Sequence, residues 1–118
     1  MDIETYRNYC ISKKLATESL PFPSLPNLLV FKIAGKMFSA ADISFFEGFS
    51  VKCNPDTIDE LKAKYPAIQN PPYFSERHWA KIILDKSIPD KQLFEWIDIS
   101  YDLVVAKLTK KVRAELNL

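Results

Sequence analysis

The 118-residue sequence contains only two glycines, two cysteines and one histidine. Gly35 and Gly48 stand apart, so the chain has no glycine-rich loop of the kind that cradles phosphate. One histidine and two separated cysteines do not supply the four clustered nitrogen or sulfur ligands of a zinc site. A serine or cysteine nucleophile would have only His78 as its base. We therefore predict no catalytic residue, no metal site and no cofactor.

Long apolar runs and an excess of one charge are also missing. No apolar stretch approaches the roughly 20 residues of a membrane helix, and the first residues do not resemble a signal peptide. Sixteen basic residues face fifteen acidic ones, so binding to nucleic acid would need a local patch of charge. We expect a cytoplasmic monomer without membrane contact. Cys10 and Cys53 are expected to be free thiols, although their spacing alone leaves a bridge open.

Apolar residues, by contrast, are plentiful. They make up 47% of the chain and include eight Phe, five Tyr and two Trp. A chain of this length buries roughly two-thirds of its unfolded surface, so this supply is enough for one core without disulfides or metal. Residues 1–118 are therefore predicted to form a single domain.

The periodicity of apolar residues predicts helices at both ends of the chain and strands between them. The expected elements are a helix capped by Asp2, strands over 28–34, 37–43 and 49–53 with a tight turn at Gly35-Lys36, a helix from Asn54-Pro55 to Pro66, a strand over 78–84, and a helix over 89–115. The last helix carries one continuous apolar stripe, formed by Leu93, Ile97, Tyr101, Val104, Leu108 and Val112. The order α-βββ-α-β-α predicts an α+β fold, an antiparallel sheet covered on one face by helices.

Several blocks of residues occur together in this chain at plausible spacing. They are Phe31–Phe38 (FKIAGKMF), Val51–Pro55 (VKCNP), Tyr65-Pro66, His78-Trp79 with Lys81, and Ser100–Val104 (SYDLV). As a set they resemble the MmcQ/YjbR family over essentially the whole chain. The resemblance implies a CyaY-like fold in which two hairpins form a "double wing". Members of the family are described as DNA-binding on the basis of that shape, which makes DNA the implied partner.

A candidate binding surface lies on the strand expected at 78–84. Strand alternation would place Arg77, Trp79 and Lys81 on the sheet face away from the helices. There an aromatic ring that can stack on a base would lie between two cations that neutralise phosphate. Lys36 and Lys52 would extend this surface. The other interpretation is that Trp79 packs under a loop and that the cations are simply solvated.

A protein- or small-ligand-binding adaptor without nucleic-acid contact is the second hypothesis. It is supported by the balanced charge and by Phe45, Phe46 and Tyr73, which fall in expected loops and would line an exposed apolar patch. A further basic cluster lies near the end of the chain, at Lys107, Lys110, Lys111 and Arg113. Its structural role is sufficient to explain it, because cations stabilise the carboxyl end of a helix.

Overall fold

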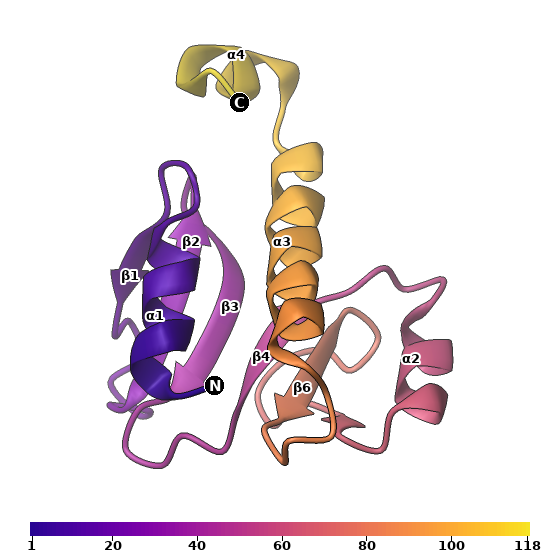
Figure 1. The fold of residues 1–118 in the computed structure, drawn as a ribbon. Coiled ribbons are helices and arrows are strands. Elements are labelled where there is room, and N and C mark those ends of the chain that lie inside the picture. The colour runs from indigo at the N-terminus through magenta and orange to yellow at the C-terminus, as the bar shows by residue number, and fades with distance from the viewer.

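A six-stranded antiparallel sheet with the strand order β1-β2-β3-β4-β6-β5 organises the protein, whose computed structural model describes residues 1–118. The elements in chain order are α1 (Ile3–Ile11), β1 (Thr17–Ser19), β2 (Leu28–Ile33), β3 (Lys36–Asp42), β4 (Gly48–Lys52), α2 (Ile58–Lys64), β5 (Ile68–Gln69), β6 (Trp79–Ile83), α3 (Asp90–Lys107) and α4 (Lys110–Leu116). Helices α1 and α3 lie over the same face of the sheet, and α2 lies beside β6 (Figure 1). The predicted α+β fold is confirmed.

The turns and caps explain where several elements begin. The β2–β3 hairpin turns at Ala34 and Gly35, with φ of 50° and 77°, a pairing typical of tight hairpin turns. Lys36, predicted in the turn, instead begins β3. Asp2 caps α1 as predicted, since its Oδ1 accepts a hydrogen bond from the Thr5 amide at 2.8 Å. Helix α2 begins later than Pro55, because Asn54 forms a separate turn before it.

The carboxyl-terminal region contains two helices, so the prediction of one helix over 89–115 is wrong. Leu108 has an extended backbone, with φ of −67° and ψ of 150°, and the helix ends there. Thr109 then caps α4, its Oγ1 accepting a hydrogen bond from the Val112 amide at 3.2 Å. Figure 1 shows α4 turned away from the axis of α3. None of the helices is both long and apolar enough to cross a bilayer.

The two short edge strands, β1 and β5, are absent from the sequence prediction. β1 pairs with β2, and β5 pairs with β6. Neither segment carries an alternation of apolar and polar residues that would mark a strand. Both are instead defined by backbone hydrogen bonds to the neighbouring strand. They widen the sheet by one strand at each edge.

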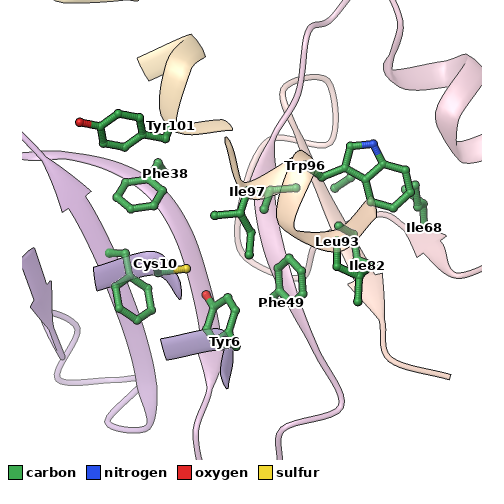
Figure 2. Close-up of a cluster of buried hydrophobic side chains, with 14 of the residues drawn as sticks. Tyr6, Cys10, Phe38, Phe49, Ile68, Ile82, Leu93, Trp96, Ile97 and Tyr101 are labelled. Carbon is green, nitrogen blue, oxygen red and sulfur yellow. The ribbon is translucent and has the colours of Figure 1, made fainter. Parts of the chain in front are cut away.

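One apolar core fills the space between the sheet and the two covering helices. It contains twenty buried residues, and aromatic rings dominate its centre. Tyr6 of α1 stacks on Phe49 at 4.8 Å between ring centroids, and Phe38 meets Tyr101 of α3 edge-on at 5.4 Å. Figure 2 shows these side chains together with Ile97, which lies between the two groups. Rings in these arrangements contribute about 0.5–1.5 kcal/mol per pair beyond the area that they bury.

The two central strands of the sheet, β3 and β4, are paired over a short length. The β3–β4 ladder contains only two residue pairs, which are Ser39 with Val51 and Ala40 with Ser50. Within this ladder Ser39 adds a side-chain link between the strands, because its hydroxyl donates to the Ser50 carbonyl at 2.9 Å. The same hydroxyl lies 2.7 Å from the Tyr6 hydroxyl of α1. A buried hydrogen bond therefore attaches α1 to this seam.

Ser100 attaches α3 to the same seam. Continuing the β3–β4 register by one pair would place Phe38 opposite Lys52. The Ser100 hydroxyl lies between their backbones, accepting from the Lys52 amide at 2.8 Å and donating to the Phe38 carbonyl at 2.5 Å. Ser100 is fully buried, and its hydroxyl provides the hydrogen-bond partner of both backbone groups. We name this arrangement the Ser100 bridge.

Replacing Ser100 with alanine should lower the free energy of unfolding by about 1–3 kcal/mol, because a buried amide and a carbonyl lose their partner. Urea unfolding followed by tryptophan fluorescence measures the change. Ser12→Ala is the matched control, because the exposed Ser12 hydroxyl bonds only to the Tyr9 carbonyl. Equal stability of the two variants would contradict the structural role of the bridge.

Candidate nucleic-acid interface

The sheet face opposite α1 and α3 is partly covered by loops. Leu28, Val30 and Ala40 on this face form a second, smaller buried cluster. Phe22 from the proline-rich segment and Phe74 from the loop before β6 pack against it. The sequence pattern predicts a single covered face, because packing of a loop onto a sheet has no periodic signature. The open part of this face is therefore smaller than alternation alone suggests.

Trp79 illustrates the effect of this covering. It lies on the predicted face of β6, directly opposite Lys52 in the strand register. Its ring stacks on Phe74 with 4.7 Å between centroids and 25° between planes, and only 8% of the residue is exposed. The prediction of an open ring at Trp79 is wrong, and the alternative that it packs under a loop is confirmed. A base has no free face of this indole to stack on.

The two cations predicted on either side of Trp79 lie in different environments. Lys81 is on the predicted face, but its Nζ lies 2.7 Å from Glu47 Oε1, which neutralises its charge. Arg77 precedes β6 in a turn, where strand alternation does not apply. It lines a hollow with Asp59 and Lys62 of α2. Arg77, Trp79 and Lys81 therefore do not form the predicted row of cation, ring and cation.

Lys36 and Lys52 come together with a third lysine. Lys36 begins β3, Lys52 ends β4 and Lys107 ends α3. Partial burial lowers the pKa of Lys52, and the charges of Lys107 and Lys36 lower this pKa further. None of the three ammonium groups forms an ion pair with a carboxylate. We name Lys36, Lys52 and Lys107 the lysine cluster; it concentrates positive charge that the protein itself does not neutralise.

The sequence pattern predicts that two of the three lysines of this cluster lie close together. In an antiparallel sheet the start of β3 and the end of β4 lie at the same end of the strands, which brings Lys36 and Lys52 together. Lys107 is assigned by the sequence only to the end of a helix. Its place beside Lys52 depends on where α3 crosses the sheet, and this is fixed by the Ser100 bridge.

The fold also brings Cys53 opposite His78, a proximity that spacing does not reveal. The Cys53 amide donates to the His78 carbonyl at 2.8 Å. The thiol, however, has its hydrogen-bond contact with the Val51 carbonyl, at 3.8 Å. Burial raises the pKa of the Cys53 thiol to about 11 and that of Cys10 to about 12. Both cysteines are free, and both favour the protonated form, whereas a nucleophile needs the thiolate.

Acidic side chains are dispersed rather than clustered. Asp98 accepts a hydrogen bond from the Tyr9 hydroxyl at 2.7 Å and pairs with Lys13, which ties α1 to α3. Glu18 pairs with Arg7 through two hydrogen-bonding nitrogens. No group of three or more His, Cys, Asp or Glu side chains is arranged to hold a metal ion.

The fold defines a class of protein, a small α+β domain with helices over one face of a six-stranded antiparallel sheet. The model of the YjbR family matches residues 11–103, and the chain belongs to this family. The resemblance inferred from the sequence blocks is thereby confirmed.

Relatives and solved structures agree with this assignment. The chain is 24% identical over 114 residues to the uncharacterized protein YjbR of Escherichia coli K12, covering 96% of this chain and 95% of that protein. It is 30% identical over 106 residues to YbdF of E. coli O157:H7, covering 85% and 86%. The crystal structure of Deinococcus radiodurans DR2400, a DUF419 domain, superposes with a TM-score of 0.90 at 30% identity, over 98% of this chain and 88% of that one. A Pseudomonas syringae crystal structure gives 0.72 at 19% identity, over 87% and 98%.

The raised thiol pKa predicts slow alkylation and disulfide exchange. In a Cys10→Ala variant at pH 8, Cys53 should react with Ellman's reagent roughly 100-fold more slowly than an unfolded cysteine, because far less thiolate is present. Stopped-flow absorbance measures both rates, with the variant in urea as the reference. A native rate equal to or above the unfolded rate would contradict the raised pKa of the Cys53 thiol.

Proposed function

We propose that the protein is a non-enzymatic DNA-binding module that contacts the phosphate backbone through the lysine cluster. The observation that carries this proposal is the convergence of Lys36, Lys52 and Lys107 from three separate elements without a carboxylate partner. Lysine side chains that neutralise phosphates release bound counterions, which drives binding without reading the base sequence.

The surroundings of the cluster suit a phosphate chain. Lys36 and Lys107 are exposed, whereas Lys52 is half-buried between them and is held at the end of β4. Burial is the main cause that lowers the pKa of Lys52, and the charges of Lys107 and Lys36 add to it; a phosphate placed among the three lysines would offset the part due to their charges. The exposed β2–β3 turn at Ala34-Gly35 lies next to Lys36, so this hairpin can approach a duplex as a wing.

The basic face extends beyond the lysine cluster in two directions. Lys32 is half-exposed on β2, and Lys110, Lys111 and Arg113 are exposed on α4, just beyond Lys107. None of these four side chains takes part in an ion pair. The overall charge of only +1 means that such local groups, rather than the field of the whole molecule, must supply the attraction. The resemblance to a family whose members are described as DNA-binding supports the same partner.

A protein- or small-ligand-binding role is the second candidate, favoured by two exposed rings. Phe45 is 72% exposed and Tyr73 is 58% exposed, and both line a hollow of about 260 Å³ together with Lys81. Phe46, predicted with them, instead packs toward the core, 5.4 Å from Tyr6 between ring centroids. Exposed rings of this size favour apolar contact with a protein or a small ligand.

The DNA proposal predicts that a Lys36→Gln, Lys107→Gln double variant binds a fluorescein-labelled duplex more weakly than the wild type at low salt. The slope of log affinity against log salt concentration should fall by up to about 0.9 for each phosphate contact removed, or about 1.8 in all. Fluorescence anisotropy titrations at several salt concentrations measure both quantities, and circular dichroism confirms that the variant is folded.

Two further variants make this test specific. Lys86→Gln with Lys91→Gln removes two exposed charges from the other end of α3 and should leave affinity and slope nearly unchanged. Phe45→Ser with Tyr73→Ser should also bind DNA like the wild type. Absence of binding at low salt, or an equal loss in both lysine pairs, would contradict a role for the lysine cluster. Loss of DNA binding confined to the aromatic pair would move the DNA contact to Phe45 and Tyr73, whereas absence of DNA binding in every protein tested would favour the second candidate.

A further inference from the structure

A cavity of about 360 Å³ lies between α2 and α3, at the end of β4. This volume falls within the range of sites for small molecules. Leu61 of α2 lines one side, Trp96 and Ile99 of α3 line another, and Val51 of β4 lies at its base. The cavity lies on the helix side of the sheet, so it is distinct from the hollow beside Phe45 and Tyr73.

The apolar wall of this cavity is held in place by packing. Trp96 meets Tyr65, at the end of α2, edge-on with 5.2 Å between ring centroids. In Figure 2 Trp96 lies at the border of the core cluster, beside Ile68 and away from Tyr6 and Phe38. Ile99, one turn further along α3, is 43% exposed. A rigid ring and an exposed branched side chain therefore face a ready-made hollow.

The charges around the cavity favour an anion. Lys52 and Lys64 line it, against a single acid, Glu60. Lys52 has no carboxylate partner, as the lysine cluster shows. Asn54 and Thr57 add uncharged hydrogen-bonding groups to the lining. The site thus combines an apolar slot with a cationic edge.

We propose that this cavity binds a small amphipathic carboxylate, whose aromatic or branched aliphatic body lies between Leu61, Trp96 and Ile99 and whose carboxylate reaches Lys52. The apolar contacts supply most of the binding, since they remove the exposed part of Ile99 and the apolar body of the ligand from water. The ion pair selects an acid over a neutral molecule of the same shape. This proposal is independent of DNA binding, although Lys52 borders both sites.

A matched pair of probes tests it, namely 4-phenylbutyrate and 4-phenylbutan-1-ol, which differ in the charged group. In a Trp79→Phe background, fluorescence reports Trp96 alone, and amide chemical shifts locate the probe. We expect saturable shifts confined to residues around Leu61 and Ile99. The acid should bind up to about fivefold more tightly than the alcohol, the range of a solvent-exposed ion pair.

Three variants complete the experiment. Lys52→Gln should remove the preference for the acid while leaving binding of the alcohol unchanged. Ile99→Glu, which places a like charge at the mouth, should abolish binding of the acid and weaken that of the alcohol. Ile43→Glu changes a similarly exposed isoleucine outside the cavity and should have no effect.

The alternatives are distinguishable from each other and from the DNA result. No saturable shift at millimolar probe concentrations, or shifts scattered over the molecule, would overturn the site. Equal affinity for the acid and the alcohol, or a preference that survives Lys52→Gln, would overturn the assigned role of Lys52. None of these outcomes depends on whether the Lys36→Gln, Lys107→Gln variant retains DNA binding.

Discussion

The hydroxyl of Ser100, set between the backbones of β3 and β4, is the contact on which the arrangement of the molecule depends. It takes the place of a ladder hydrogen bond at the point where these strands separate. Because it is buried and bonded on both sides, α3 has one position in which neither backbone group is left unpaired. In that position Ile97 lies in the core and Trp96 faces α2. It also places Lys107 near Lys52, at the end of β4. The core, the cavity and the lysine cluster therefore all depend on this position of α3 on the sheet.

Local patterns in the sequence were sufficient for the main elements and insufficient where long-range contacts decide. The cap at Asp2 and the alternation in β6 are properties of adjacent residues, and both are confirmed. The apolar stripe continues through Leu108 and Val112, so periodicity alone conceals the break that the extended backbone of Leu108 introduces. The stacking of Phe74 on Trp79 joins a loop to a strand, and no spacing rule predicts it.

The candidate sites show the same division. Lys36 and Lys52 were predictable together because antiparallel pairing places the two strand ends at one edge. Lys107 joins them only through the crossing position of α3. Lys81 kept its predicted face, but Glu47, from the segment before β4, neutralises it. The apolar cavity between α2 and α3 has no counterpart in the sequence pattern, since its walls come from three elements whose stripes are individually ordinary.

The short ladder between β3 and β4 has a mechanical consequence. With two residue pairs there, against six between β2 and β3 and five between β4 and β6, we expect the sheet to bend more easily between β3 and β4 than between their outer neighbours. Helix α3 packs over both β3 and β4 and so spans the junction between them. Lys36 belongs to β3, and Lys52 belongs to β4. An anion held by both lysines would therefore connect β3 to β4 a second time. Binding at this surface would then make the whole sheet stiffer.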